Sequence, residues 1–530
     1  MIRSKGRPDK KPATSPERSL KVESFQQELQ WFQYIPSLEP RQPFLSSKPV
    51  IWRTDGDIKA LFRDPRKKRI VYEPNEHGVG TPPKQSTLHS NSSLFNMSGV
   101  IWTGMEEALH ELKAPFEGSL SEDTDYSKNV PDPIHKLYTG NNLPILKYLL
   151  GEISQEVKVI YIDPPYNTGS ILNYHDRFSV PYKKTSPGKW DKALDEWLSK
   201  PSADHSPWMA FMFPRLALAR KLLRPDGVIF ISIDDREIPR LRLLMDWIMG
   251  EKNHIGTVVW RKKVVRGRGN RHIIPQTEYI VCYAKDISIL SPFQEPLTDD
   301  MIDAYTKKDE MGAYKEIPLA KSGTAHSPRP NLVYPIVAPD GTTIHCPTHQ
   351  WRWSEKTFKE RQQEILFRKT KKGVWRVLTK QYLETAEGLR FRTPTSFYDK
   401  VTTTDGTKEL QTISGNGNFD FPKPSRLIRD LISWATTGSP DPDGPEIILD
   451  FFAGTAPTAQ AVLDLNREDH RRRICYLVQD RIEDPRHTDK ILELAKIRIQ
   501  KSRESPSNGS PEVPSIFPQG FRLFHYLPPT

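Results

Sequence analysis

Cysteine is scarce in this 530-residue chain, and its few copies are scattered. The three cysteines, Cys282, Cys346 and Cys475, form no paired C-x-x-C spacing. They therefore predict neither a disulfide framework nor a thiolate metal site. Cys346 and His349 lack the partner ligands that a zinc ion needs. We therefore expect no metal site. The absence of paired cysteines also suits a protein of the reducing cytoplasm.

Long hydrophobic runs are missing as well. No apolar stretch approaches the length needed to span a membrane. The first residues, MIRSKGRPDKKPATSPERS, have no apolar core like that of a signal peptide. The chain also shows no internal repeat. We expect a soluble protein that makes no membrane contact.

Basic residues exceed acidic ones. Lys and Arg number 77 against 66 Asp and Glu, which gives a formal net charge of +11 and a sequence pI of about 9.2. This balance favours a polyanionic partner without identifying it, and a slightly basic soluble surface is the plain alternative. The length leaves room for two or three domains.

The pattern along the chain divides into six parts. Short apolar strands alternate with helices over 126–260 and again over 415–500, which predicts an α/β fold around a parallel sheet covered on both faces. Between them, 261–414 contains short mixed segments and scattered aromatics, typical of an inserted α+β domain. The flanking parts are a disordered basic tail at 1–20, an N-terminal region at 21–125 and a C-terminal tail at 501–530.

The segment VIYIDPPYNTGS ends an apolar strand in an acid, two prolines and a tyrosine. In an open α/β sheet the ligand crevice lies beyond the carboxyl ends of the strands, where Asp163 stands. Pro164 and Pro165 carry no N–H, so this corner offers carbonyl acceptors without competing donors. An ionised Asp163 and a carbonyl can hold both hydrogens of an –NH2 group, and Tyr166 offers a face to a planar base. A simple strand end with a Pro-Pro turn is the alternative.

A second strand-to-helix corner lies in ILDFFAGTAPTAQAV. A strand ending in Asp450, a small-residue turn at 453–456 and a helix starting near Thr458 would direct backbone amides at an anionic group of a ligand. A tight turn of any α/β protein is the alternative here.

The segment WRKKVVRGRGNRH places six basic residues in a glycine-interrupted loop. Such a loop suits phosphate contact and ordering on binding, and a solvated surface loop is the alternative. The six residues are Arg261, Lys262, Lys263, Arg266, Arg268 and Arg271.

Together these segments resemble the β-class amino-DNA methyltransferases, particularly the modification subunits of type III restriction-modification systems. The β-class order, with the catalytic block before the cofactor-loop block and a target recognition domain between them, is present. The resemblance runs from about residue 100 to 500 and includes the segments WTGMEEALHELKAP, LYTGNNLPILKYLL, VIYIDPPYNTGS, FMFPRLALARKLLRPDGVIFISIDDREI, TEYIVCYAKD, WRWSEKTF, FDFPKPSRLI and ILDFFAGTAPTAQAVLDLN.

The resemblance implies a Rossmann-like S-adenosylmethionine-dependent methyltransferase sheet with an inserted α+β target recognition domain. It also implies S-adenosyl-L-methionine as cofactor and the N6 amine of a flipped adenine in duplex DNA as substrate. The implied catalytic residues are Asp163, Pro164, Pro165 and Tyr166, and the six basic residues are the implied DNA contacts. The implied cofactor-binding residues are Asn141, Asn142, Asp163, Phe421, Lys423, Pro424, Asp450, Phe452, Gly454, Thr455, Thr458 and Gln479.

The sequence departs from the family pattern at three places. The family loop Gly-Ser-Gly-Thr-Thr reads 454-GTAPT-458, so Ala456 replaces a glycine that adopts positive φ freely, and Pro457 removes an amide donor. Pro is tolerated in a first helical turn. Asn141 replaces the Asp of the Gly-Asp-Asn-Leu segment. Gln479 ends a strand where many methyltransferases place an acid on the ribose, and an amide can still accept one hydrogen bond there.

Duplex DNA is the expected partner, and a homodimer and a restriction or other defence subunit stay open. The chain shows no loop for nucleoside triphosphates and no helicase-like blocks, so any DNA cleavage must come from a partner. Two rival functions also stay open. One is a methyltransferase acting on cytosine N4, RNA adenine or a protein amide. The other is a catalytically impaired DNA-recognition subunit, which the altered loop favours and the intact DPPYNTG segment opposes.

Overall fold

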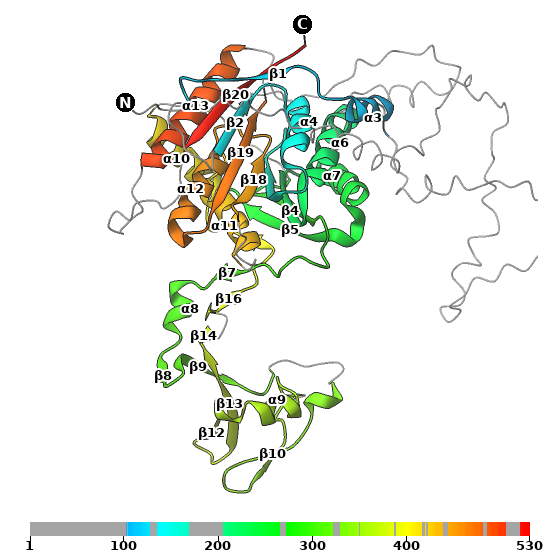
Figure 1. The fold of residues 1–530 in the computed structure, drawn as a ribbon. Coiled ribbons are helices and arrows are strands. Elements are labelled where there is room, and N and C mark those ends of the chain that lie inside the picture. Colours follow the sequence, from blue (N-terminus) through cyan, green and yellow to red (C-terminus); the bar gives the residue numbers. More distant parts are fainter. Residues whose placement is uncertain are drawn as a thin grey trace, which may run out of the picture. The chain divides into compact units, whose positions relative to one another are not determined.

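A ten-stranded sheet forms the centre of the fold (Figure 1), in the order β1-β20-β2-β19-β18-β3-β4-β6-β5-β17. The strands are Ser119–Glu122 (β1), His135–Thr139 (β2), Val157–Ile162 (β3), Leu223–Ile233 (β4), His254–Arg261 (β5), Thr277–Ala284 (β6), Phe397–Tyr398 (β17), Glu446–Asp450 (β18), Arg473–Gln479 (β19) and Phe521–Leu527 (β20). The computed structural model describes residues 102, 104–127, 135–168, 205–264, 272–321, 329–348, 350–385, 388–415, 419, 422–437, 444–480, 485–504 and 520–529.

The sheet is mixed. All ladders from β20 through β2, β19, β18 and β3 to β4 are parallel, as predicted. The predicted parallel sheet is therefore confirmed only for these strands, because β1 runs antiparallel to β20 and β6 runs antiparallel to both of its neighbours, β4 and β5. A short apolar run predicts burial in a sheet but carries no information on strand direction.

Helices cover both faces of the sheet. Every residue of β3, β18 and β19 is buried, and successive side chains point to opposite faces, so neither face is left to solvent. Helices α3, α4 and α7 contact α6, whereas α11 and α13 contact α12 and α10 contacts α13. The bounds are Met105–Lys113 (α3), Asn142–Ile153 (α4), His205–Leu222 (α6), Ile238–Met245 (α7), Asp246–Gly250 (η3), Glu251–Asn253 (η4), Thr403–Ser414 (α10), Ser425–Thr436 (α11), Pro457–Asp469 (α12) and Pro485–Glu504 (α13).

An α+β insert lies between β6 and β17 in the chain. It has a four-stranded sheet in the order β12-β13-β9-β8 and a core of its own around Trp351. Its elements are Glu295–Pro296 (β7), Asp299–Asp303 (α8), Lys307–Asp309 (β8), Gly312–Pro318 (β9), Pro330–Leu332 (η5), Ile336–Val337 (β10), Thr343–Ile344 (β11), Glu355–Glu360 (α9), Gln362–Glu364 (η6), Ile365–Lys369 (β12), Trp375–Tyr382 (β13), Glu384–Thr385 (β14), Gly388–Leu389 (β15) and Phe391–Arg392 (β16). The predicted range 261–414 is too wide, because β6 and β17 belong to the main sheet and α10 packs on α13.

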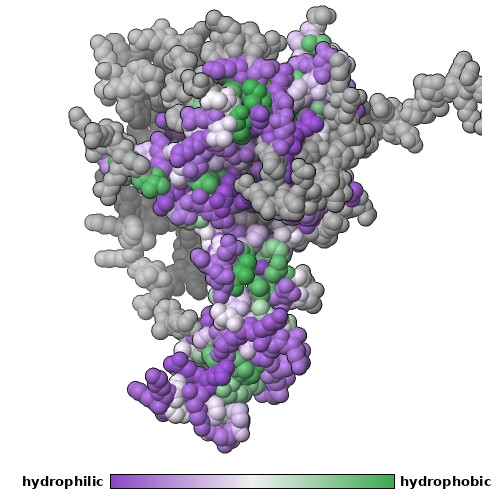
Figure 2. All heavy atoms as spheres, turned by 90° about the vertical axis from the view of Figure 1, so that its left-hand side faces the viewer, coloured by the Kyte–Doolittle hydropathy of each residue, from purple (hydrophilic) through white to green (hydrophobic). Residues whose placement is uncertain are grey.

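The face drawn in Figure 2 is mainly hydrophilic, with hydrophobic residues gathered in small patches. Large apolar side chains that stay exposed in the insert include Val337, Val374 and Leu389. Within the described ranges, no helix combines the length and apolar character required to cross a membrane. The same residues contain no group of three or more His, Cys, Asp or Glu side chains that could hold a metal ion.

Both ends of the described chain join the main sheet. Strand β20 lies between β1 and β2, and its Phe521 and Leu523 are buried. The interpretation of 501–530 as a tail is therefore wrong for β20, and 21–125 contributes β1 to the same sheet. The inward residues Phe521 and Leu523 alternate with Arg522, which is a strand signal that the preceding Pro- and Ser-rich segment obscured.

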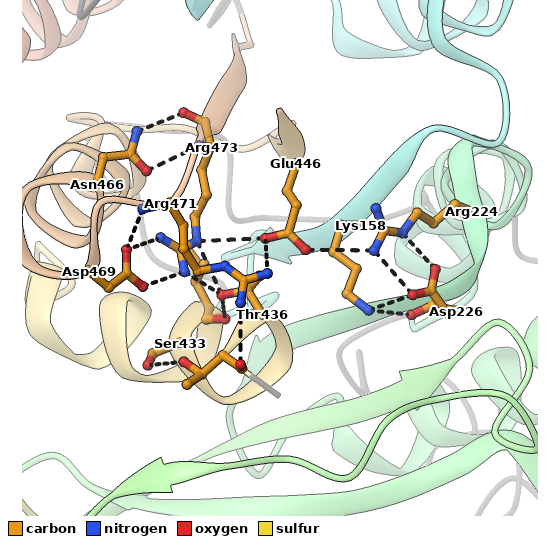
Figure 3. A network of polar contacts seen from close by, with 12 residues as sticks. Lys158, Arg224, Asp226, Ser433, Thr436, Glu446, Asn466, Asp469, Arg471 and Arg473 are labelled. Carbon is orange, nitrogen blue, oxygen red and sulfur yellow. Dashed lines mark hydrogen bonds and ion pairs between the residues drawn. The ribbon is translucent and has the colours of Figure 1, made fainter. Parts of the chain in front are cut away.

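A network of charges closes the amino-terminal edge of the sheet (Figure 3). Glu446, the first residue of β18, is 1% exposed, and burial raises the pKa of its carboxyl group against the opposing effect of nearby arginines. Three guanidinium groups lie 3.6–3.9 Å from its carboxylate: those of Arg224, Arg471 and Arg473. Lys158 of β3 pairs at 2.9 Å with Asp226 in the same network. Charges at this edge are thus matched within the protein.

We predict that Leu523→Ala destabilises the fold by about 2–5 kcal/mol, because it removes a fully buried side chain from β20. Leu527→Ala, at the half-exposed end of the same strand, is the matched control and should change the free energy of unfolding by about 0.5 kcal/mol or less. Urea unfolding followed by circular dichroism measures both. Equal effects would show that β20 does not contribute to the core.

Candidate functional site

Strands β3 and β18 bring two acids to the same edge of the sheet. The two strands are parallel neighbours, with Ile160 opposite Leu449. Asp163 follows β3 directly and Asp450 ends β18, so both stand at the carboxyl edge. The two α/β halves, separated by the insert in sequence, therefore form one sheet with one crevice edge.

Asp163 is bound on one oxygen by two neighbours. Its Oδ1 accepts a hydrogen bond from the Tyr166 hydroxyl at 2.7 Å and lies 3.0 Å from Lys423 Nζ. Lys423 Nζ also donates to the Tyr166 hydroxyl at 2.7 Å and lies 4.9 Å from the centroid of that ring. The Asp163 side chain keeps 29% exposure, whereas Lys423 keeps 7%. The carboxylate is thus oriented from the protein side and still reachable.

Glu278, from β6, extends this cluster. Its Oε2 lies 3.0 Å from Lys423 Nζ, and its Oε1 accepts from Lys262 Nζ at 2.8 Å. Glu278 is 7% exposed, in a strand that is otherwise largely apolar. The cluster therefore alternates in charge, from Lys262 through Glu278 and Lys423 to Asp163.

Burial and charge act on these groups in opposite senses. Burial raises the pKa of Asp163, and Lys423 only partly offsets that effect. Burial would also raise the pKa of Glu278, but Lys423 and Lys262 together outweigh it and lower the pKa. For Lys423, burial is outweighed by Asp163 and Glu278, so its pKa is raised. Lys423 and Glu278 are therefore both charged at neutral pH.

The backbone after Asp163 is fixed by two contacts. The Pro165 carbonyl accepts a hydrogen bond from Trp208 Nε1 at 2.7 Å. Asn167 adopts a left-handed conformation with φ 56°, and its Nδ2 donates to Glu237 Oε1 at 2.7 Å. The DPPYN segment is therefore anchored to α6 and to the start of α7 rather than held by its prolines alone.

The turn after β18 has the conformation that the family's glycine would allow. Ala456 has φ 59° and ψ 44°, in the left-handed region, and is fully buried. Left-handed geometry costs a non-glycine residue about 1–2 kcal/mol. Pro457 is the first residue of α12, where its missing N–H has no partner in the helix anyway. The turn is therefore kept despite both substitutions.

Asp450 stabilises this turn from within. Its Oδ1 accepts from the Phe452 N–H at 3.0 Å, and its Oδ2 accepts from the Thr458 hydroxyl at 2.5 Å. Burial raises the pKa of Asp450 to about 7. Thr458 is fully buried, and the neighbouring Thr455 is 2% exposed. Asp450 and Thr458 thus shape the loop from inside.

Asn142 joins the first half of the sheet to this loop. Its Nδ2 donates to the Phe451 carbonyl at 3.0 Å, and its Oδ1 accepts from Arg215 Nε at 2.6 Å. Asn142 is fully buried. Burial lowers the pKa of Arg215 to about 10. Both polar ends of Asn142 are therefore used within the protein, which gives it a structural role at the site.

Gln479 offers an unused acceptor beside the same loop. It ends β19 and is 6% exposed, and within the described part of the chain its Oε1 has no hydrogen-bond partner. The backbone carbonyl oxygen of Gln479 accepts a hydrogen bond from the Gly140 N–H at 3.1 Å, which places the next residue, Asn141, at the same edge. Asn141 caps α4 by accepting from the Leu143 N–H. A ribose hydroxyl could supply the hydrogen-bond donor that the Gln479 Oε1 atom lacks among the described residues.

The predicted cofactor residues fall into two groups. Those around β18, β19 and α4 lie at the carboxyl edge, namely Asn141, Asn142, Asp450, Phe452, Gly454, Thr455, Thr458 and Gln479. The described contacts of Lys423 are instead with Asp163, Tyr166 and Glu278. Pro424, the next residue, caps α11. Phe421 lies outside the described residues.

Sequence reasoning missed Glu278 and Arg215. An acid inside the apolar strand TEYIVCYA, and an arginine inside the apolar helix WMAFMFPRLALA, were the available signals. Both are charged residues in segments that the fold buries, which is rare without a partner or a function.

The six predicted DNA contacts are only partly described. Lys262 is held by Glu278 and is 18% exposed, whereas Lys263 is exposed. Arg261 is half-buried at the end of β5. The remaining three, Arg266, Arg268 and Arg271, lie outside the described residues. Of the three that the structure describes, Lys263 is the most exposed, and the role of all six in DNA binding stays a prediction.

Comparisons with a family model and with known proteins point to the same family. Residues 157–484 match the N6_N4_Mtase family model, described as DNA methylase. The StyLTI Mod subunit of a type III restriction-modification enzyme, from Salmonella typhimurium, is 32% identical over 414 residues, covering 75% of this chain. The type II methyltransferase M.KpnI, from Klebsiella pneumoniae, is 35% identical over 374 residues, covering 65% of this chain and 80% of that protein.

The chain spans 61% of the length of the StyLTI subunit. Among solved structures, TTHA0409 from Thermus thermophilus, complexed with S-adenosyl-L-methionine, is 14% identical with a TM-score of 0.32, covering 74% of this chain and 99% of that one. A TM-score this low supports no conclusion about this chain.

We predict that Asp450 makes stability fall with rising pH. Its pKa is about 7 when folded against 3.8 when unfolded, so its contribution is complete below pH 3.8 and is lost as the pH rises through 7. From pH 5 to pH 8, the free energy of unfolding of Asp450→Asn should rise by about 2–3 kcal/mol relative to that of the wild type, because only the wild type loses this contribution. Urea unfolding at each pH measures the difference. Asp286→Asn, at the protein surface, is the control. A pH-independent difference between wild type and Asp450→Asn would contradict the prediction.

Proposed function

The chain belongs to the DNA methylase family, and from this premise we propose that it is a site-specific DNA methyltransferase that modifies the N6 amine of adenine in duplex DNA. We place it as the modification subunit of a restriction-modification or related defence system, as its relatives' names suggest. One observation carries the proposal: the Asp163 corner and the Asp450 loop share the carboxyl edge of β3 and β18.

S-adenosyl-L-methionine is the proposed cofactor, and the residues at the edge fit it. The Gln479 side-chain oxygen, which has no hydrogen-bond partner among the described residues, would accept from a ribose hydroxyl. The turn at Gly454 and Thr455 leads into the N-terminus of α12. The rest of the holding set is Asn141, Asp450 and Phe452. When bound, the cofactor supplies a methyl group on a positively charged sulfur.

Asp163 would hold the substrate amine. Adenine must leave the duplex stack to reach this edge, and this base flipping costs about a few kcal/mol of stacking and pairing energy. Asp163 and the Pro164 carbonyl would accept the two N6 hydrogens, because the Pro165 carbonyl is already engaged by Trp208. Tyr166 would stack on the base with the ring face opposite Lys423.

This grip favours transfer in two ways. Drawing both N6 hydrogens towards acceptors turns the nitrogen lone pair outward, towards the methyl donor, and a fixed approach removes much of the entropic part of the barrier. The negative charge of Asp163 stabilises the positive charge that grows on N6 as the new N–C bond forms. As that bond forms, the bond between the methyl carbon and sulfur would break and leave a neutral thioether, and N6 would then pass one proton to Asp163 or to water. The methyl group would go directly to N6, so no covalent bond to the protein is needed.

We assign the insert between β6 and β17 as the target recognition domain of a Rossmann-like methyltransferase sheet. Its separate core around Trp351 lets its surface vary without disturbing the site. The basic loop that follows β5 begins beside the site at Lys262, which suits a segment that grips phosphates near the flipped base. A cytoplasmic location, a homodimer and a restriction subunit as partner belong to the same proposal.

The rival substrates and the impaired-enzyme alternative are separable by experiment. The chain is expressed in a methylation-free host, modified bases are mapped by single-molecule sequencing, and the DNA is digested to nucleosides. N6-methyladenine at one sequence supports the proposal, whereas N4-methylcytosine assigns the other amine. No modified base, together with no S-adenosyl-L-methionine binding by calorimetry in the presence of DNA, favours a recognition subunit.

We predict that Asp163→Ala lowers methylation by at least about 10²–10³-fold, because it removes the charged acceptor of the amine. Duplex binding, measured by fluorescence anisotropy, should change little, since phosphate contacts dominate affinity. Asp286→Ala removes a surface acid at the opposite edge of the sheet and is the matched control. Wild-type turnover by Asp163→Ala would refute the assigned role.

We predict that replacing Arg266, Arg268 and Arg271 with Gln flattens the salt dependence of DNA binding. The slope of log K against log salt should decrease by about 2–3, roughly one for each phosphate that the variant no longer neutralises. Lys262 is left unchanged because Glu278 already pairs with it. An unchanged slope would remove this loop from the interface.

A further inference from the structure

The acceptor oxygen of Asp163 already carries a cation. Lys423 Nζ lies 3.0 Å from Oδ1 of Asp163, the carboxylate that the proposed function offers to the substrate amine. The same ammonium lies 3.0 Å from Glu278 Oε2 and 2.7 Å from the Tyr166 hydroxyl. Lys423 is thus held from behind by one acid while it faces another.

These contacts separate Lys423 from the cofactor loop. Every described polar contact of Lys423 is made with Asp163, Tyr166 or Glu278, and its ring contacts are with Tyr166 and Trp260. Trp260 is fully buried and is itself fixed by a hydrogen bond to the Val401 carbonyl. The side chain therefore sits in a rigid place beside the catalytic corner.

We propose that Lys423 and Glu278 are positioning residues for Asp163. Glu278 holds the ammonium of Lys423 against Asp163 Oδ1, and this contact fixes the orientation of the carboxylate that meets the incoming amine. This inference rests on the proposed function and names two residues that act on the same carboxylate. It also moves Lys423 from the cofactor-binding set, where the resemblance placed it, to the catalytic corner.

The charges around Asp163 make the two residues act in opposite directions. Lys423 lowers the pKa of Asp163 and Glu278 raises it, against the larger raising effect of burial. The other groups facing this cluster are constant in the comparison: Tyr161 from β3, Asp234 after β4, Lys262 after β5 and Asp450 from β18. Removing Lys423 or Glu278 therefore changes the charge beside Asp163 by equal and opposite amounts.

Lys262 gives the pair a link to the basic loop. Its ammonium holds the second oxygen of Glu278 at 2.8 Å, and its carbonyl accepts from the backbone N–H and the hydroxyl of Thr403 at the start of α10. The beginning of the loop is thereby fixed relative to Glu278.

The test compares Lys423→Met, Lys423→Arg and Glu278→Gln in the full chain, with methylation measured against pH on DNA that contains the mapped sequence. For Lys423→Met, the acid limb of the kcat profile should move to higher pH by on the order of one unit, because the carboxylate is harder to ionise. For Glu278→Gln it should move to lower pH. In both variants kcat falls about tenfold or more, since Asp163 is less well placed, whereas Lys423→Arg should keep the wild-type limb.

Two further measurements make the outcome decisive. Calorimetric affinity for S-adenosyl-L-methionine should stay within about twofold of wild type in both charge variants, because neither residue touches the cofactor loop. Lys400→Met is the matched control, since Lys400 also bridges two acids, Glu295 and Asp430, but makes no contact with Asp163. It should alter thermal stability without moving the acid limb.

Three results would overturn the inference. If the acid limb of the kcat profile does not move in Glu278→Gln, a charge effect on Asp163 is excluded. This variant alone decides the question if Lys423→Met fails to fold. A tenfold loss of cofactor affinity in Lys423→Met with an unmoved limb returns Lys423 to the cofactor. Limbs that move in the same direction point to general disruption. Failure of the proposed function itself is distinct, because the wild-type chain would then methylate no DNA.

Discussion

The parallel pairing of β3 with β18 is the contact on which the site depends. It joins segments that lie on either side of the insert, and it sets Asp163 and Asp450 at one edge. Two hydrogen bonds also join the two halves: Asn142 donates to the Phe451 carbonyl, and Lys423 donates to the Tyr166 hydroxyl. Without that pairing, each half would carry an incomplete set of groups, with the Asp163 corner in one and the Asp450 loop in the other.

The two edges of the sheet treat charge differently. At the amino-terminal edge, guanidinium groups of three arginines lie 3.6–3.9 Å from the Glu446 carboxylate. At the carboxyl edge, Asp163 keeps part of its surface open and Gln479 keeps an oxygen unpaired among the described residues. Opposite charges face one another at the amino-terminal edge, so the partly exposed acid at the carboxyl edge is the better candidate for contact with a ligand.

Sequence reasoning was strong where a pattern is local. Short apolar runs that end in special residues predicted the strand end at Asp163, the turn before α12 and the strands β18 and β19, and the structure has these elements where they were predicted. The left-handed Ala456 was also foreseeable, since a glycine-rich family loop implies positive φ. These features are encoded by residues close together in the chain.

Long-range placement was not foreseeable in the same way. Nothing local to FRLFHYL indicates that β20 inserts between β1 and β2, and nothing in TEYIVCYA indicates that Glu278 meets a lysine that lies 145 residues later. The limits of the insert were misjudged for the same reason, because β6 and β17 join a sheet whose other strands lie far away in sequence. Strand neighbours and buried ion pairs depend on topology, which periodicity does not specify.

The interleaved strand order also has a consequence for how the protein is made. Neighbours in the sheet come from distant stretches of the chain; the hydrogen bond from Asn142 to Phe451 spans 309 positions. A nascent polypeptide that has emerged only as far as the insert has β3 but lacks β18, β19 and β20, so its apolar strand edges stay unpaired on the ribosome. The site at the carboxyl edge would therefore be completed in a single late step of synthesis, and a truncated translation product would carry only one half of it.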